Sequence, residues 1–600
     1  MDRKTVLLLL ASFGALFLWQ FLVSVWFPPV PKPPGSTNLV ATATNALGTN
    51  AVPAVSNATS AVAVAPSANP AIVIPPDAPE SFEFVTNNHA IYTFTSRGGG
   101  VKQVQLTEYL EVVGCDRSQS TNLFATLNQN ARVPVFAMQA ADALGDNQFK
   151  LTRASPTSVI AEKPLSSGLR VVKQFDVGSN YQMTVRVRIE NPTAQPMVFP
   201  EQQLSAGTAT PMGPRDDMTW MGTFWHNGQE AEHIEHSWFS GGGGCFNRSP
   251  KLDYSSGTNR IQWAAAHNQF FAMAVVPANT NSYGSQFRAQ MFDMPRPTAA
   301  DIVVDPKVIR EPHGIESMVS FPAMTVPAGQ AIERQFTFYA GPKQEKLLAG
   351  LGRGTDAIMD FGFFSAISKL MLRVMNIIHA GVASITPDKL GDYAMALVIM
   401  TILIKLIFWP LTAKSTRSMK KMQALSPELK KIQEKYKDDP MKMNKKVMEF
   451  WKENKVSPMS GCWPMLIQLP IFFALFRMIP NAIELRGQPF LWACDLSKPD
   501  TILLLPGLGF PLNPLPLLMG LTMFVQARMT PASPGMDPAQ QAMMKYMPLI
   551  FLVFLYNQPA GLTLYWTVQN LLTILQTKLT NAKKEPAPAP APVAPAKKKK

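Results

Sequence analysis

The chain has 600 residues, of which 46% are hydrophobic and 16% are charged. This low charge content, together with 32 Met and 35 Phe, excludes an intrinsically disordered chain, a collagen and a small disulfide-stapled domain. The four cysteines form neither a CxxC pair nor a Cys/His cluster, which argues against a structural zinc site.

The net charge of +14 is concentrated in two short blocks beside apolar segments. Residues 413–459 carry +7 and residues 578–600 carry +6, whereas residues 28–358 carry −2. Lysine and arginine next to membrane spans mark the cytoplasmic side of a membrane protein. A DNA-binding protein would carry its basic residues on a folded domain with interleaved aromatic residues, so we expect no DNA partner.

The first segments predict an anchor followed by a tether. Residues 5–27 form an apolar stretch of 23 residues without a formal charge, and a helix of this length spans about 34 Å, enough to cross a bilayer. We predict an uncleaved transmembrane anchor at 1–27, with a cleaved signal peptide as the alternative. Residues 28–80 contain eleven prolines, which predicts an extended linker on the exported side.

Residues 81–345 predict an antiparallel β-sandwich outside the cytoplasm. In 181–189, apolar and polar residues alternate as in a strand with one buried face, and glycine-rich turns separate such strands. A helical period with a narrow polar stripe then runs over 361–382. We predict an amphipathic helix at 357–382 in the membrane interface, and the alternative is a helix packed on the sandwich.

Five further apolar segments complete a prediction of six transmembrane helices, five of them in a core at 391–582. They lie at about 392–412, 463–480, 502–525, 543–557 and 561–580. Six spans place both termini, the Lys-rich tail at 583–600 and the basic block at 413–459 in the cytoplasm. Within that block, 416–436 and 441–455 predict a helical hairpin broken at 437–440.

Lys405 stands inside the apolar segment 392–412, where a charge costs about 2.5–3.5 kcal/mol. Thr401 lies one turn earlier on the same helix face. We interpret the pair as part of a hydrophilic cavity, and the alternative is that the lysine reaches the lipid headgroups. The other polar residues in the segments, which line such a cavity or form ordinary interhelical hydrogen bonds, are Gln468, Thr522, Gln526, Asn557, Gln558, Thr563, Gln569 and Asn570.

No constellation of catalytic residues is visible in the sequence. His233 and His236 lie among Glu230, Glu232 and Glu235, but the spacing matches no zinc motif, and we expect a solvated acidic loop there. The chain contains no GxSxG, P-loop, HExxH or Rossmann motif. We therefore expect no enzyme activity, no cofactor and no metal.

A dense motif, SPMSGCWPMLIQLPIFFALF, occupies residues 457–476 and combines Pro458, Gly461, Cys462, Pro464, Leu466-Ile467-Gln468 and Pro470. It is supported by Trp409-Pro410-Leu411-Thr412, Ala482-Ile483-Glu484-Leu485-Arg486 and Pro559-Ala560-Gly561-Leu562. The set resembles the YidC family of membrane protein insertases, shared by bacteria, mitochondria and chloroplasts. The resemblance covers about 361–582. Arg97 to Gly100 and Tyr339 to Pro342 extend it to the exported domain, which looks like the periplasmic β-supersandwich of bacteria with two membranes.

The resemblance implies an insertase and chaperone of the bacterial inner membrane, with five helices around a groove open to cytoplasm and lipid. The family carries an arginine in this groove, and Lys405 occupies its position, so the charge is kept without the planar guanidinium. Thr401 matches the polar neighbour, and Tyr565 or Trp566 the facing aromatic residue. The implied partners are nascent membrane proteins, the Sec translocon, the lipid bilayer, and the ribosome and targeting machinery, reached through 413–459 and the Lys-rich tail.

Two other function classes fit parts of the sequence. A secondary transporter would also contain polar residues and broken helices near the membrane midplane, but the sequence has no evident inverted repeat and no paired acidic residues in the spans. A carbohydrate-binding sensor or enzyme built on the sandwich would lose its activity if 81–340 were deleted, whereas an insertase would keep it.

Overall fold

The computed structural model divides into a β-rich unit and a helical unit, which are described separately. The first predicted anchor (1–27), the linker up to residue 78 and the tail (583–600) lie outside the described residues, as do Cys115, Cys245 and Cys462. The structure describes residues 79–113, 123–140, 143–241, 249–256, 260–304, 308–385, 392–437, 439–454, 456, 463–504, 510–529 and 538–582.

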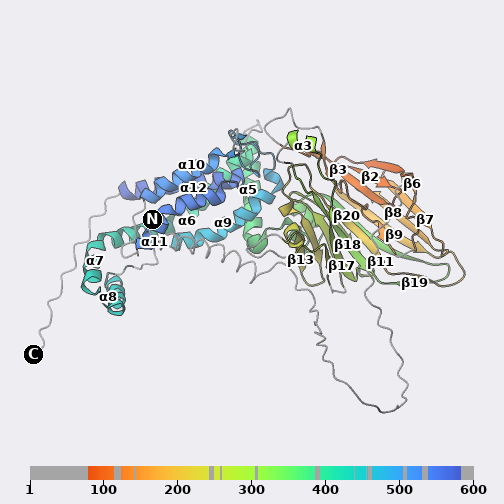
Figure 1. Ribbon diagram of the computed structural model, residues 1–600, viewed down its shortest axis with the longest axis horizontal. Coiled ribbons are helices and arrows are strands. Elements are labelled where there is room, and N and C mark those ends of the chain that lie inside the picture. Colours follow the sequence, from red (N-terminus) through yellow and green to blue (C-terminus); the bar gives the residue numbers. More distant parts are fainter. Residues whose placement is uncertain are drawn as a thin grey trace, which may run out of the picture. The chain divides into compact units, whose positions relative to one another are not determined.

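Within the described part of the β-rich unit, the largest sheet has nine strands, all paired antiparallel. The predicted alternation at 181–189 is confirmed in β9, where Met183, Val185 and Val187 are buried between polar neighbours. Figure 1 shows β9 beside β8 and β20, its paired neighbours. The order is β13 (Ala231–Glu235), β12 (Gly222–His226), β15 (Trp263–His267), β16 (Phe271–Pro277), β20 (Ala331–Pro342), β9 (Gln182–Glu190), β8 (Arg170–Val177), β7 (Ser158–Pro164) and β6 (Lys150–Ser155).

A second antiparallel sheet packs against the first, as expected for a sandwich. Trp225 of β12 stacks on Phe287 of β17 with ring centroids 4.4 Å apart and planes 8° apart. Both side chains are buried, so the core lies between the sheets. The order of this sheet is β14 (Asp253–Ser255), β17 (Gln286–Asp293), β18 (His313–Phe321), β11 (Gln202–Ala209) and β5 (Met138–Gln139).

Smaller sheets and short helices complete the unit. A further antiparallel sheet contains β1 (Phe82–Thr86), β2 (Ala90–Thr95), β3 (Gly100–Leu110) and β4 (Phe124–Leu127), and β10 (Met197–Phe199) pairs with β19 (Met324–Val326). The short helices are α2 (His236–Phe239), α3 (Ala299–Val304) and α4 (Glu345–Gly350).

A buried lysine of β8 binds two segments that lie between strands. The Lys173 ammonium on β8 is fully buried and donates to the carbonyl oxygens of Gly98 at 2.7 Å and Phe136 at 2.8 Å. Gly98 has φ +72°, a conformation that favours glycine and aims its carbonyl inward. The ammonium also lies 4.4 Å from the centroid of the Phe149 ring. Burial lowers the pKa of Lys173 well below its ordinary value.

The helical unit contains α5 (Ser365–Ile385), α6 (Asp392–Ala424), α7 (Ser426–Lys435), α8 (Pro440–Glu453), α9 (Trp463–Asn481), α10 (Pro514–Met529), α11 (Pro538–Leu555) and α12 (Ala560–Ala582). Among the described residues, two helices, Gly362–Ser384 and Tyr393–Ala424, are long and apolar enough by length and composition to cross a membrane. The helix predicted at 361–382 is confirmed as α5. It packs on α6 and α9.

Two predicted boundaries in this unit were wrong. The segment 392–412 does not end before the basic block, because α6 continues to Ala424, and the predicted helix 416–436 is therefore the end of α6 plus α7. Pro427, in the first turn of α7, cannot continue the α6 hydrogen-bond ladder. The helix predicted from 502 begins only at Pro514, because Leu503 and Leu504 pair instead with Leu512 and Pro511.

The predicted basic hairpin has a small core of its own. Met422 of α6, Leu429 of α7, and Phe450 and Trp451 of α8 are buried together with Val456. The Asp439 side chain accepts a hydrogen bond from the Lys442 backbone N–H at 3.0 Å and so caps α8. The hairpin is therefore a packed element, and most of the lysines that the structure describes in it are exposed.

Candidate functional site

Lys405 lies at the centre of the candidate site, on the buried side of α6. Its side chain is 4% exposed, and Nζ donates a hydrogen bond to Oγ1 of Thr573 on α12 at 2.8 Å. Among the described residues, no carboxylate forms an ion pair with this ammonium group. A buried charge whose protein partner is a neutral hydroxyl retains most of its electrostatic attraction for an acidic group.

Lys405 lines a small cavity of about 20 Å³. Two amide side chains face the same cavity and continue the polar contacts away from the lysine. Gln569 Nε2 donates to Gln468 Oε1 at 3.4 Å, and Gln468 Nε2 donates to the hydroxyl of the fully buried Tyr565. The lining residues are Ile404, Lys405, Phe408, Leu411, Thr412, Ile467, Gln468 and Gln569.

Helical spacing explains why these side chains meet. On α12, Tyr565, Gln569 and Thr573 follow one another at intervals of four residues, so they share a face, and their contacts reach α9 and α6. On α6, Thr401 is one turn before Lys405 and is fully buried, but its hydroxyl donates to the Leu397 carbonyl of its own helix at 2.7 Å. Thr401 thus supports this face without lining the cavity.

Three other predicted site residues lie elsewhere in the helical unit. Thr522 on α10 accepts a hydrogen bond from Asn570 Nδ2 at 3.1 Å, which joins α10 to a different face of α12. Gln526 is half-buried one turn further along α10. Trp566 packs edge-on against Phe472 with ring centroids 4.9 Å apart. None of the three is among the residues that line the Lys405 cavity.

The sequence reasoning missed two polar residues of α12 that contact α6. Gln576 is 3% exposed and donates through Nε2 to Thr412 Oγ1 at 2.7 Å, and Thr573 accepts from Lys405. A signal existed, because Gln569, Thr573 and Gln576 recur at helical spacing in an otherwise apolar segment. The pairing of α12 with α6 required the tertiary structure.

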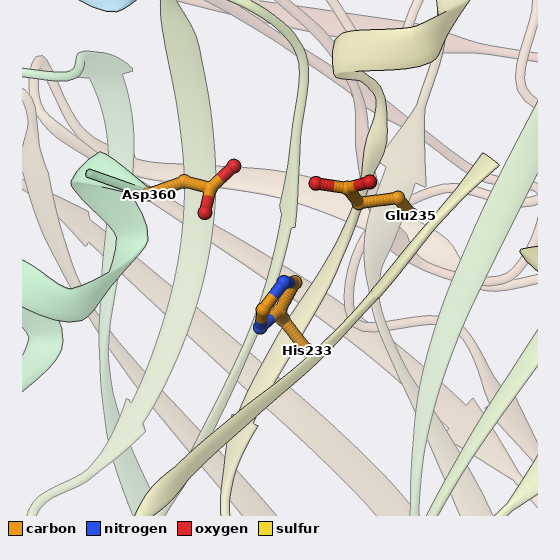
Figure 2. Close-up of side chains that lie close together, drawn as sticks. All are labelled: His233, Glu235 and Asp360. Carbon is orange, nitrogen blue, oxygen red and sulfur yellow. The ribbon is translucent and has the colours of Figure 1, made fainter. Parts of the chain in front are cut away.

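The histidine-rich region near residue 233 is a strand, so the predicted solvated loop was wrong. His233 and Glu235 belong to β13, which pairs with β12 through Phe224 opposite His233, and Figure 2 shows both side chains on one side of the strand. His236 Nε2 lies 3.1 Å from His313 Nδ1. Burial, followed by the nearby His313, lowers the pKa of His236 to about 4.

Asp360, also labelled in Figure 2, belongs to the helical unit. Its two carboxylate oxygens each lie 3.2 Å from Nη2 of Arg477 on α9. Asp360 is 7% exposed and has φ +52°, a conformation that costs a non-glycine residue energy. The ion pair therefore holds a strained junction just before α5 against α9.

Comparison with known proteins identifies the family. The sequence profile described as "60Kd inner membrane protein" matches residues 385–587, and that of the "YidC periplasmic domain" matches residues 85–374. The "Membrane protein insertase YidC" of Pelobacter propionicus is 31% identical over 603 residues, which covers 97% of this chain and 99% of that protein. The chain belongs to the YidC family.

Other relatives agree with this assignment. The YidC insertase of Geobacter sulfurreducens is 30% identical over 82% of this chain and 84% of its own length. A crystal structure described as an active YidC insertase with the first transmembrane domain resolved covers 84% of this chain and 93% of its own, with 16% identity and a TM-score of 0.33. The assignment rests on the sequence matches, because so low a TM-score does not identify a fold. The YidC family resides in the inner membrane, so the helical unit is its insertase core and the β-rich unit its periplasmic domain.

Proposed function

We propose that this protein inserts nascent membrane proteins and helps them to fold, using the Lys405 cavity as a hydrophilic, positively charged groove. The observation that carries the proposal is the buried Lys405, which has a neutral partner in a cavity among apolar helices. A relative that covers 97% of this chain is named a membrane protein insertase. The activity is a transfer between environments, so the proposal needs no cofactor and no bond-breaking step.

The physical role of such a groove is to reduce the thickness of the low-dielectric layer that the polar flank of a client must cross. A hydrophobic client segment with a polar flank must bring that flank across a low-dielectric layer, where unpaired polar and charged groups are costly. A polar cavity that reaches partway reduces the distance, and the Lys405 charge attracts an acidic flank into it. Release of the apolar segment into lipid then drives the step by about 25 cal/mol per Å² of apolar surface removed from water.

We assign the predicted groove residues to two parts. Lys405, Gln468 and Tyr565 belong to the polar centre, together with Gln569 and Thr573. Thr401 supports the centre from within α6. Thr522, Gln526 and Trp566 belong to the wall formed by α10 and α12, where they guide the client segment but do not contact the lysine. Lysine in place of the family arginine keeps the attraction for a carboxylate without a bidentate contact.

The proposed topology has six spans, with both termini and the 413–459 hairpin in the cytoplasm and the domain at 81–345 in the periplasm as a supersandwich. In this scheme 357–382 is an interface helix and 391–582 the core. Cys494, in the loop after α9, is disulfide-bonded. Disulfides persist in oxidising compartments and are rare in the cytosol, which supports a periplasmic position for that loop and hence a cytoplasmic position for the hairpin on the other side of α9.

The proposed partners follow from the positive charge of the hairpin and the tail and from the proposed insertase activity. We propose that the hairpin and the Lys-rich tail bind the ribosome or the targeting machinery, because lysine clusters neutralise RNA phosphates, and that the protein acts alone or with the Sec translocon. Removal of residues 583–600 should weaken ribosome binding in a salt-dependent manner. An unchanged affinity at low salt would mean that the tail only fixes topology.

The decisive test uses purified protein in liposomes with a single-span client whose translocated tail is acidic. Lys405→Ala should lower the insertion rate about tenfold or more, since a buried attraction of several kcal/mol is lost, whereas Lys405→Arg should retain most of it. Lys578→Ala, on the exposed side of α12, is the matched control. Normal insertion by Lys405→Ala would show that the lysine only reaches toward the headgroups.

A further inference from the structure

The cavity beside Lys405 is too small for a client segment in this conformation. Its volume of about 20 Å³ leaves room for about one water molecule, since a single water needs at least roughly 10–15 Å³ of such a cavity. Pockets that bind ligands in proteins are larger, at about 300–1,000 Å³. The proposed insertase activity therefore requires the walls of this cavity to move apart.

The wall that α6 contributes contains a point where this helix can bend. Pro410 lies inside α6 and has no backbone N–H, so it cannot donate to the carbonyl of Leu406 four residues earlier. Sharp kinks in helices occur mainly at such positions. Residues that line the cavity lie on both sides of Pro410, with Lys405 before it and Thr412 after it. A bend at Pro410 would thus move one part of this wall relative to the other.

A side chain of α12 joins the two parts of α6 across Pro410. Gln576 is 3% exposed, and its Nε2 donates to Thr412 Oγ1 at 2.7 Å and to the Trp409 carbonyl oxygen at 3.3 Å. A backbone carbonyl can only accept a hydrogen bond, so the contact with Trp409 fixes Nε2 as the end of the amide that faces α6. Because Trp409 precedes Pro410 and Thr412 follows it, this one amide group opposes a bend between them.

We propose that Gln576 is a positioning residue, which holds the Lys405 cavity closed until the part of α6 beyond Pro410 moves away from α12. That part of α6 ends in the basic hairpin, where Met422 packs in the same core as Trp451 of α8. A partner that binds the hairpin therefore acts on α6 through a packed contact, and Pro410 is the hinge. The inference rests on the proposed insertase function and specifies how the groove opens.

The first test measures insertion of a single-span client by the full-length protein in liposomes. Gln576→Leu should insert the client about fivefold faster than the wild type, because the closed form loses the equivalent of one net hydrogen bond. Thr577→Val is the matched control, since the Thr577 hydroxyl donates within its own helix to the Thr573 carbonyl at 2.8 Å, and its rate should equal that of the wild type. An unchanged or lower rate in Gln576→Leu, with the wild type active, would overturn the proposal and leave the insertase function intact.

The second test follows the opening of the cavity without a client. Ile467 of α9 lines the cavity, so Ile467→Cys should react with a water-soluble maleimide when the cavity opens to water. Mass spectrometry of the peptide that contains residue 467 separates this reaction from labelling of the native cysteines. We expect Gln576→Leu to raise the labelling rate about fivefold, and a rate equal to that of the Thr577→Val control would overturn the proposal.

Two comparisons assign the effect to the contact between Gln576 and α6. Thr412→Val should also speed labelling, and the double variant should be no faster than Gln576→Leu alone, because both substitutions remove the same contact. Met375→Cys, at a fully buried position on α5, should react no faster in Gln576→Leu than in the wild type. Additive effects of the two substitutions, or faster labelling at residue 375 as well, would show general loosening of the helices and would overturn the proposal.

Discussion

Lys173 provides a quantitative test of what holds the β-rich unit together. Lys173→Met keeps the length of the side chain but removes the donors to the Gly98 and Phe136 carbonyl oxygens, now 2.7 and 2.8 Å from Nζ. Each buried carbonyl left without a donor costs about 1–3 kcal/mol of stability. Part of this loss is offset, because the variant no longer buries a charged ammonium group. We expect the free energy of unfolding to fall by about 2–4 kcal/mol.

The pH dependence of the free energy of unfolding gives an independent test of the buried Lys173. Burial lowers the folded-state pKa of Lys173 below its ordinary value of 10.5, so between the two values the unfolded chain binds more protons than the folded one. The stability of the wild type should therefore rise with pH up to about 10.5, and this rise should be smaller in Lys173→Met. A neutral amine still has two N–H groups, enough for both carbonyls.

The assay is urea unfolding of a fragment containing residues 79–359, followed by the fluorescence of Trp225 and Trp263, which are fully buried. Lys150→Met, at an exposed position on β6, is the matched control and should change stability by no more than about 0.5 kcal/mol. A Lys173→Met fragment that is as stable as the wild type, or more stable, would refute the reasoning. It would mean that desolvation of the ammonium outweighs its hydrogen bonds.

Three further predictions concern other sites. Arg477→Met removes the ion-pair partner of the Asp360 carboxylate, which is 7% exposed, and should therefore speed amide hydrogen exchange in α5. Arg477→Lys should restore part of the protection. Unchanged exchange in Arg477→Met would contradict the role of this ion pair. Peptide mapping without reductant should recover the Cys494 peptide linked to another cysteine peptide, and a free thiol at Cys494 in the membrane-inserted protein would count against the proposed topology. His236 has a folded pKa of about 4 against an ordinary 6.5, so it should contribute stability that is complete above pH 6.5 and falls by about 3 kcal/mol as the pH is lowered to 4. The loss should be absent in His236→Gln, and an equal loss in both proteins would assign it to other groups.

Local patterns in the sequence determined the elements and their chemistry. The alternation at 181–189 predicted β9 because a strand exposes successive side chains on opposite faces, and the helical period at 361–382 predicted α5. Lys405 could be singled out because a charge in an apolar segment is costly wherever that segment folds. These inferences need only neighbours along the chain.

Only the tertiary structure decided which polar residues meet. Thr573 and Gln576 face Lys405 and Thr412 from more than 160 positions further along the chain, and no local pattern encodes which helix packs on which. For the same reason, the sequence could not show that Thr522 lies apart from Lys405. The helix α12 presents Asn570 to α10 and Gln569 to α9 on different faces. Helix ends also depended on context, since α6 runs through Pro410 and ends only near Pro427. Periodicity sets which side chains share a face, whereas packing decides what that face contacts.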